Sequence, residues 1–291
     1  MCMTTCYRPG VSDKDIMEWN RMVEDLEKKR EGAVNERNRK DRSGGLFQKY
    51  RRIVFFDTET TGFDSDKDDQ IIELAAVAVD RDGAEQRMDK FIQLTTKDEL
   101  PAKVTEVTGI LPITLSAEGK PEPDVIREFI WMMELPEDAD LFDQLEAKTL
   151  LVAHNAQFDL LFLAYTILRN KEVGKGWMTV FNDADYLDSL TVYKDRRDYP
   201  HKLENAITAY GLDGKVQNSH RAIDDTLALY EVVKAIGREE DNLINYVNVF
   251  GYNPKYGIAG RTLKKVRYLS QPYRYGGRGE PLYTKITDKN G

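Results

Sequence analysis

Long apolar runs are missing from this sequence, and no stretch reaches the roughly 18 apolar residues that a membrane-spanning helix needs. The first residues, MCMTTCYRPG, also lack the apolar segment of a signal peptide. Both absences predict a cytoplasmic protein that is not embedded in a membrane. Cysteine is scarce as well, because Cys2 and Cys6 are the only two in the chain. Since structural zinc needs about four ligands, we interpret them as reduced thiols rather than metal ligands.

The composition is that of a folded protein, with 41% hydrophobic and 32% charged residues and no internal repeat. A chain of 291 residues accommodates one α/β domain of about 200 residues with extensions. The net charge of −8 is unevenly spread: residues 51–250 carry 22 basic and 39 acidic side chains, whereas residues 251–291 carry 9 and 2. An acidic body with a basic tail indicates contact with nucleic acid or a membrane surface, without choosing between them.

We predict three parts: an N-terminal helix and linker (1–50), a main domain (51–240) and a basic, aromatic-rich C-terminal extension (241–291). Within residues 11–30, apolar side chains recur at spacings of three and four, which predicts a helix that packs on the main domain or binds a partner protein. These side chains are Ile16, Trp19, Met22, Val23 and Leu26. The polar stretch that follows ends in paired glycines, as is typical of a linker.

The main domain alternates short apolar runs with helical patterns. Strands are expected from Ile53 to Asp57 and over 71–80, 90–94 and 150–155, with an Asp82-Gly83 turn that joins two of them as a hairpin. Helices are expected over 122–134, 157–169 and 203–212, and from a Ser219 cap to about Ala235. Strands first and then alternating helices predict an α/β fold, a mixed sheet covered by helices.

The first candidate site follows the first strand, in FDTETTG (56–62). Asp57 and Glu59 are two residues apart in an extended segment, so their side chains point to the same side. A pair of carboxylates suits a hard divalent cation such as Mg²⁺, which prefers oxygen ligands. Gly62 suits a position where the backbone closely approaches a ligand. Taken alone, the motif is more typical of a solvated acidic loop.

The second candidate site is AHNAQFDLLFL (153–163), at the end of another strand. Asn155 is positioned to cap the helix that Asp159 joins, which brings a third carboxylate to the carboxyl edge of the sheet. His154 alone is more typical of a structural histidine than of a catalyst. Phe158 suits either the core or stacking on a base.

The third candidate site is SHRAIDDTLALYEVV (219–233). Asp225 lies on the first turns of a helix, and its neighbour Asp224 cannot point the same way. His220 precedes the helix, where an imidazole, which titrates near pH 6.5 in model peptides, is suited to take a proton from water. Acidic residues also favour helix N-termini for their dipole alone.

A fourth acidic segment, DSDKDDQIIELA (64–75), has acids at the first, third and fifth positions of a calcium-binding loop. However, Asp69 stands where that loop requires glycine, and Ala75 stands where it requires glutamate. We therefore interpret this segment as a solvated acidic loop.

The order DxE, HNxxFD and HxxxxD resembles the DEDDh 3′–5′ exonuclease superfamily, most closely the proofreading exonuclease domains of bacterial replicative DNA polymerases. The resemblance covers about residues 51–236 and includes VTEVTGI (104–110), which looks like a strand. It implies a ribonuclease-H-like fold and two Mg²⁺ ions, for which Mn²⁺ substitutes. The implied ligands and base are Asp57, Glu59, Asp159, Asp225 and His220.

In the scheme that the resemblance implies, Asp57 bridges both ions, Glu59 and Asp225 hold the ion that carries the attacking water, and Asp159 anchors the second. His220 accepts the proton of that water. The intervening residues are expected to bind the substrate: Thr58, Thr60, Thr61, Gly62, His154, Asn155 and Phe158. Hydrolysis of a phosphodiester needs both a nucleophile from water and stabilisation of the leaving oxygen, which two ions supply.

The expected substrate is the 3′ end of single-stranded or frayed DNA, with a ribonuclease of the same superfamily as the alternative. The 2′-hydroxyl contacts that distinguish RNA are not readable from one chain. A non-catalytic nucleic-acid-binding module is the alternative from another class, although a pure binder gains nothing from four repelling carboxylates. A replication or repair role would need a partner such as a polymerase, and no membrane partner is expected.

The C-terminal extension interleaves basic and aromatic residues, a composition that suits a guide for single-stranded nucleic acid. The alternative is a small structural extension that packs its tyrosines on the main domain. The residues concerned are Arg261, Lys264, Lys265, Arg267, Arg274, Arg278, Tyr252, Tyr256, Tyr268, Tyr273 and Tyr275.

Overall fold

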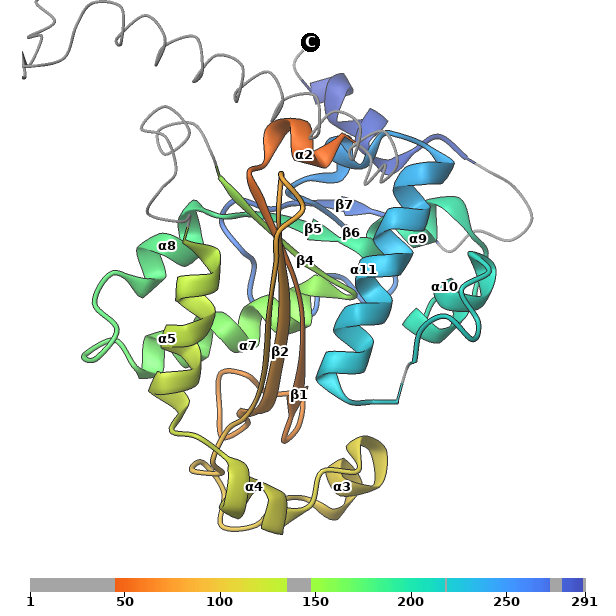
Figure 1. Ribbon diagram of the computed structural model, residues 1–291. Helices are drawn as coiled ribbons and strands as arrows, with labels where there is room; N and C mark the ends of the chain where they lie inside the picture. Colours follow the sequence, from red (N-terminus) through yellow and green to blue (C-terminus); the bar gives the residue numbers. More distant parts are fainter. Residues whose placement is uncertain (1–44, 135–147, 218, 273–278, 290–291) are drawn as a thin grey trace, which may run out of the picture. The chain divides into compact units, whose positions relative to one another are not determined.

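The computed structural model describes residues 45–134, 148–217, 219–272 and 279–289 (Figure 1). The predicted helix at 11–30, both cysteines and all but the last residues of the 1–50 segment lie outside this description, as do Tyr273, Arg274, Tyr275 and Arg278. Residues 42–291 form one compact unit. None of the helices in the described ranges has the length and apolar character required to cross a bilayer.

The centre of this unit is a five-stranded mixed sheet with the order β3-β2-β1-β4-β5. Strand β2 pairs antiparallel with β1 and β3, whereas β4 pairs parallel with β1 and β5. The strands are β1 (Arg52–Thr60), β2 (Ile71–Asp80), β3 (Glu85–Phe91), β4 (Thr149–Ala153) and β5 (Asp185–Asp188). The predicted hairpin is confirmed, since Gly83 adopts φ 85° in the turn between β2 and β3.

Helices cover both faces of the sheet (Figure 1). One layer contains α5 (Glu122–Met133), α7 (Ala156–Arg169) and α8 (Trp177–Asp183), and the other contains α9 (Ser189–Arg196), α10 (Leu203–Ala209) and α11 (Ala222–Glu239). Three short helices, α2 (Leu46–Lys49), α3 (Ala102–Thr108) and α4 (Pro112–Glu118), complete the main body. This is the predicted fold class, a mixed sheet flanked by helices.

Strand β1 distributes its side chains between the two layers with the period of two expected of a strand. Val54 and Phe56 join the core on the α5 and α7 side, whereas Ile53 and Phe55 join the core on the α11 side. Continuing this alternation sends Asp57 and Glu59 toward α11 and Thr58 toward α7. The hydrophobic pattern of the strand therefore determines which helix each polar side chain at its carboxyl end can meet.

The segment 104–110, expected to be a strand, is instead helix α3 followed by Gly109, so that prediction was wrong. Pro101 stands at the N-cap, and Gly109 ends the helix at φ 70° with its N–H on the Thr105 carbonyl, both typical helix boundaries. The strand expected at 90–94 begins earlier and ends at Phe91, and Ile92 adds only an isolated bridge to Lys120.

The C-terminal extension packs on the main body. It consists of η1 (Leu243–Tyr246), a two-stranded parallel sheet of β6 (Val249–Tyr252) and β7 (Arg267–Ser270), and η2 (Leu282–Lys289). Leu243, Tyr246, Val249 and Leu282 are buried in the core that α11 also joins. The Asp195 carboxylate on α9 accepts hydrogen bonds from Tyr246 and from the Leu282 N–H. The extension therefore shares the core of the main body.

Candidate metal site

Three predicted carboxylates meet at the carboxyl end of β1. Asp57, Glu59 and Asp225 each place an oxygen so that the three oxygens lie within 4.8 Å of one another. Asp57 and Glu59 arrive from the α11 face of β1, and Asp225 lies in the first turn of α11. Residues 168 positions apart are thus joined because α11 packs against the face that carries the two strand carboxylates.

Asp159 lies beside this trio without being one of its three members. It is on the first turn of α7, and its Oδ1 accepts a 2.6 Å hydrogen bond from the Thr58 hydroxyl, which points from β1 toward that helix. Its charge acts on Asp57, which shows that all four predicted carboxylates belong to one electrostatic site.

The start of α7 is capped by a residue that the sequence did not reveal. Asn155 occupies the N-cap position, but its side chain makes no capping hydrogen bond, so the predicted role was wrong. Asp188, at the end of the neighbouring strand β5, accepts from the Asn155 and Ala156 N–H groups at 2.9 and 3.1 Å. The reason is that Asn155 adopts φ 69° and ψ 45°, outside the extended conformation usual for a capping side chain.

The four carboxyl groups share a site that disfavours their charged forms. Burial, and then the charges of Asp159, Glu59, Asp225 and Glu73, hold the pKa of Asp57 well above its usual range. Burial and the Asp225 charge raise the pKa of Glu59 to about 8. Burial also raises the pKa of Asp159 to about 7, against the Thr58 hydrogen bond, and that of Asp225 to about 6, against the nearby His220 charge. Such a site is stable in its charged form only with cations present.

The residues fit a divalent cation. Asp225 Oδ1 is buried and has no hydrogen-bond partner among the described residues, so one oxygen of the trio is left for a ligand. All donors in the trio are carboxylate oxygens, the ligands that Mg²⁺ and Mn²⁺ prefer. The Asp57, Glu59 and Asp225 carboxylates would hold the cation, with Asp159 beside them.

Next to Glu59 of the trio lies an ion pair that sequence reasoning missed. Glu73, on β2 opposite Glu59, is 0% exposed and accepts from Arg221 Nη2 at 2.7 Å and from Nε at 3.0 and 3.2 Å. It also accepts from the Ala222 N–H at 3.2 Å, which caps α11. Ser219, expected to cap this helix, donates instead to Asp224 at 2.5 Å, so that prediction was wrong. A lone glutamate inside the apolar run IIELAAV was the available signal.

His220 stands on the loop that precedes α11, and its side chain is exposed. It adopts φ 57°, a left-handed conformation that is uncommon for residues other than glycine. His220 and Asp225 line a cleft of about 490 Å³, together with His154, Asn155, Leu190 and Lys194. The structure therefore brings the predicted histidine to the same cleft as Asp225, one of the predicted carboxylates.

His154 borders this cleft with both ring nitrogens engaged. Its Nε2 lies 3.0 Å from the His201 carbonyl oxygen, and its Nδ1 lies 3.0 Å from Ser189 Oγ. Burial lowers its pKa, which favours the neutral ring. These contacts are those of a structural histidine that orients the end of β4 and the start of α9.

The polar residues that follow β1 fasten a loop. Thr60 donates to the Gly62 carbonyl at 2.7 Å, and Thr61 donates to Asp69 at 2.9 Å. A side chain at Gly62 would overlap the Asp69 carboxylate, so the backbone of Gly62 closely approaches Asp69. Asp69 is buried and also binds Lys97 at 3.0 Å. The loop expected to be solvated is thus anchored by one of its acids.

Two aromatic rings meet where this loop faces α7, Phe63 from the loop and Phe158 from the helix. Phe158 is half-buried and packs on Phe162 with ring centroids 4.9 Å apart. Phe63, which sequence reasoning did not single out, is 90% exposed and lies 6.3 Å from Phe158, edge to face. An exposed phenylalanine directly after the DTETTG motif is thus available to a ligand of the site.

Comparison with known proteins identifies the family of this chain. A model of the RNase_T family, described as exonuclease, matches residues 54–233. The chain is 32% identical to the PolC-type DNA polymerase III of Clostridium perfringens over 204 residues, 70% of this chain but only 12% of that protein. It is 30% identical to DNA polymerase III subunit epsilon of Treponema pallidum over 190 residues, 64% of this chain and 78% of that subunit.

Among solved structures, E. coli exonuclease I in complex with a dT13 oligonucleotide superposes with a TM-score of 0.54 at 20% identity. The match covers 67% of this chain and 43% of that one. At this identity the likeness concerns the fold, which is the ribonuclease-H-like exonuclease fold that the sequence predicted. In length, the matched part of the chain corresponds to a minor part of the PolC-type relative and to most of the epsilon subunit.

Proposed function

The chain belongs to the exonuclease family whose model matches residues 54–233, and on that premise we propose that it removes nucleotides one at a time from the 3′ ends of DNA. The observation that carries the proposal is the meeting of the Asp57, Glu59 and Asp225 carboxylates within 4.8 Å. These groups repel one another, and among the described residues none of the three is part of an ion pair. A site of this kind is of use to a protein that binds cations there.

We propose that the carboxylates hold two Mg²⁺ ions, for which Mn²⁺ substitutes. When bound, such ions lower the pKa of water and stabilise the leaving oxygen of a phosphodiester. The charges of Glu59, Asp225 and Asp159 all raise the pKa of Asp57, which suits Asp57 to serve both ions. The Thr58 hydroxyl orients Asp159 through its 2.6 Å hydrogen bond.

His220 is the proposed general base. It is exposed, it shares the cleft with Asp225, and an imidazole nitrogen there accepts the proton that leaves the attacking water. Arg221 directly follows His220, and its ion pair with Glu73 holds the backbone at this point. Glu73 also caps α11. The loop thus keeps His220 near Asp225 while its side chain stays exposed.

Single-stranded or frayed DNA is the proposed substrate. The curated relatives are named as DNA polymerase III proteins, and the exonuclease I structure contains a DNA oligonucleotide. In this chain, the exposed Phe63 ring and the half-buried Phe158 ring beside the carboxylates suit stacking on unpaired bases. Assistance to a polymerase is part of the proposal and rests on the relatives alone.

The test uses 5′-labelled single-stranded DNA, duplex DNA and RNA of one sequence, each with Mg²⁺ and with excess EDTA. We expect a ladder of one-nucleotide steps from the 3′ end of the DNA strand, lost in EDTA and restored by Mg²⁺ or Mn²⁺, with Ca²⁺ binding but not supporting turnover. Undiminished cleavage in EDTA would overturn the metal mechanism. A ladder on RNA alone would replace DNA by RNA as the substrate.

A further inference from the structure

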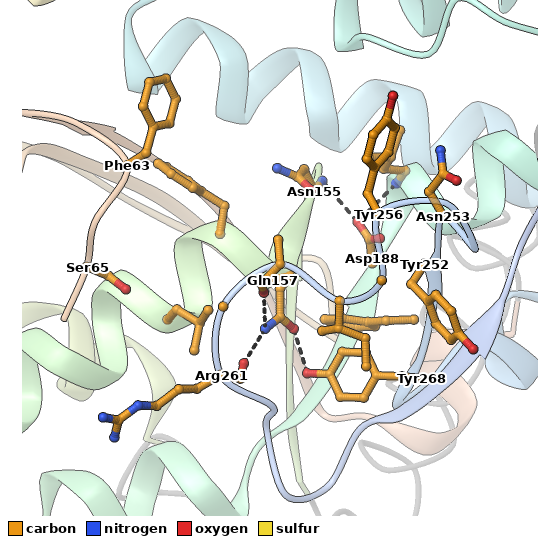
Figure 2. Close-up of a pocket in the computed structure, with 18 of the residues that line it drawn as sticks. Phe63, Ser65, Asn155, Gln157, Asp188, Tyr252, Asn253, Tyr256, Arg261 and Tyr268 are labelled. Atoms are coloured by element: carbon orange, nitrogen blue, oxygen red, sulfur yellow. Dashed lines mark hydrogen bonds between the residues drawn. The ribbon is translucent and has the colours of Figure 1, made fainter.

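A second pocket, of about 520 Å³, lies between α7 and the C-terminal extension (Figure 2). Leu161, Phe162 and Phe250 are among its apolar lining residues. Asn155, Leu190 and Lys194 line both this pocket and the cleft that contains His220 and Asp225. The pocket therefore adjoins the proposed active site, although one of its walls comes from residues beyond the matched exonuclease segment, which ends at 233.

The extension wall is a loop, residues 253–261, that is fastened to the helix carrying Asp159. Gln157 Nε2 donates to the carbonyl oxygens of Arg261 at 2.6 Å and Ala259 at 3.4 Å, and Gln157 Oε1 accepts from the Tyr268 hydroxyl at 2.5 Å (Figure 2). Gly260, at φ 72°, lies so close that an added Cβ would stand 2.8 Å from Leu161 Cδ1. The loop therefore has one defined position against α7.

The tip of this loop has its own internal hydrogen bonds. The Asn253 carbonyl accepts from the Tyr256 N–H at 3.1 Å and from the Gly257 N–H at 2.8 Å, and its side chain accepts from the Lys255 N–H at 2.9 Å. The turn leaves the Tyr256 ring 73% exposed at the pocket, with Lys255 Nζ 5.0 Å from the ring centre. An exposed aromatic side chain is thus held by a structured turn.

Charged side chains of both signs line the pocket. From the extension, the exposed Arg261 guanidinium lies over the Tyr165 ring at 5.5 Å and has no ion pair in the described part of the chain. Asp64 and Asp66, on the segment that follows β1, also line the pocket. A phosphate is therefore favoured beside Arg261 and disfavoured beside these two acidic residues, which leaves the aromatic interior to an uncharged flat group.

We infer that this pocket binds an unpaired base of the substrate strand, upstream of the linkage that is cut, with a phosphate of that strand beside Arg261. The inference rests on the proposed function and adds to it a strand-binding subsite built by the C-terminal extension. A volume of about 520 Å³ is within the roughly 300–1,000 Å³ of small-molecule sites. A base held in a duplex cannot enter, so the subsite favours single strands.

The test measures binding with a full-length chain carrying Asp225→Asn, so that the strand is not cut. Single-stranded oligonucleotides carry one fluorescent 2-aminopurine, moved stepwise from the 3′ end. We expect quenching at one upstream position, which Tyr256→Ala removes. The same change should raise Kd about 5- to 150-fold, as loss of one base stack of ~1–3 kcal/mol implies. Arg261→Ala should flatten the slope of log Kd against log salt by about 0.7, one phosphate contact.

Matched controls are Trp131→Ala, an exposed aromatic on α5, and Arg87→Ala, an exposed arginine on β3. Neither should change Kd or the salt slope, and Tyr256→Phe, which keeps the ring, should keep both the quenching and the affinity. An unaltered Kd and quenching profile in Tyr256→Ala would overturn the inference. Cleavage by the unsubstituted chain is measured separately. If that chain cuts DNA but Tyr256→Ala leaves binding unaltered, only the subsite is refuted. If it cuts no substrate, the proposed function is refuted.

Discussion

Two groups of carboxylates in this molecule differ in whether hydrogen-bond donors and cations compensate their negative charge. Asp185, at the start of β5, accepts from the Tyr50 hydroxyl at 2.7 Å and from Asn248 Nδ2 at 2.9 Å, and lies 3.4 Å from Lys265 Nζ. Burial alone would raise the pKa of Asp185, but these partners outweigh it and the pKa is lowered. Asp69 behaves alike, because the Asp64 N–H, Lys97 and Thr61 outweigh burial and lower its pKa.

Asp57, Glu59 and Asp225 are the opposite case, since burial and the charges of neighbouring carboxylates raise the pKa of each. The protein supplies the trio with other carboxylates as neighbours and leaves Asp225 Oδ1 without a partner among the described residues. The comparison teaches that the partners of a buried acid, rather than its burial, separate a structural carboxylate from one reserved for a ligand.

The largest expected effect contrasts Asp57→Asn with Asp185→Asn. Asp57→Asn should lower kcat by at least about 10⁴-fold, because several kcal/mol of charge stabilisation are lost and each 1.36 kcal/mol is tenfold. The metal-free protein should become more stable, since a repelling charge is removed. Asp185→Asn should cut DNA but unfold more easily, by roughly 1–3 kcal/mol for lost buried hydrogen bonds. Steady-state kinetics and thermal unfolding in EDTA measure both, and matching phenotypes would contradict the distinction.

The sequence predicted the sheet, the main helices and the carboxylate site because each depends on local pattern. A period of two in IVFFDTE puts Asp57 and Glu59 on one face, and an apolar stripe along 222–236 turns α11 toward that face. The motif spacing then placed His220 and Asp225 at the start of this helix. These features were predictable because the same residues that pack the core also orient the site.

Partners that come from distant segments were not predictable. The Glu73–Arg221 pair joins residues 148 apart, and Asp188 caps a helix that starts 32 residues before it. Asn155 and Ser219 are residue types that commonly cap helices. Nevertheless, the N–H groups at the starts of α7 and α11 donate to the distant carboxylates of Asp188 and Glu73. Likewise, composition could not show which basic residues of the extension bind the main body. Lys265 donates to the Asp183 and Ala184 carbonyls, whereas Arg261 is exposed.

The second prediction tests the proposed base. His220→Ala should lower kcat by about 10²–10⁴-fold with little change in KM, because the substrate still binds while the water keeps its proton. Ser219→Ala, which alters the same loop without removing an imidazole, is the control and should lower kcat far less. Near-normal turnover by His220→Ala would show that His220 is not the base.

The third prediction concerns the Glu73–Arg221 pair next to the site. Glu73→Gln should weaken its hold on Arg221 and the start of α11, and lower metal affinity or kcat by about 10–100-fold, as is typical for residues that orient metal ligands. Glu85→Gln, on the exposed edge strand and paired with Arg87, is the matched control and should have no effect. A Mg²⁺ titration of activity that coincides for Glu73→Gln and the unsubstituted chain would show that the pair does not position the site.

The smallest expected effect is on the pH dependence of stability. The site carboxylates and the structural carboxylates should contribute to stability in different pH ranges. The raised pKa values, about 8 for Glu59, 7 for Asp159 and 6 for Asp225, mean that the metal-free folded state holds more protons than the unfolded chain above about pH 4. Their contribution to stability is therefore present in acid and is lost as pH rises through 6 to 8. Asp69 and Asp185, with lowered pKa values, contribute above about pH 4 and lose that contribution only in stronger acid.

In EDTA, we therefore expect Tm to fall by several degrees between about pH 5 and 9, since ~1 kcal/mol shifts Tm by ~2–4 °C in a domain of this size. Mg²⁺ should raise Tm more at pH 8 than at pH 5, because a cation competes with protons for the same oxygens. Asp57→Asn should reduce the fall in EDTA, and Asp69→Asn should leave it in place while removing part of the loss below about pH 4. A Tm in EDTA that rises between pH 5 and 9 would mean that the trio does not repel itself as its geometry requires.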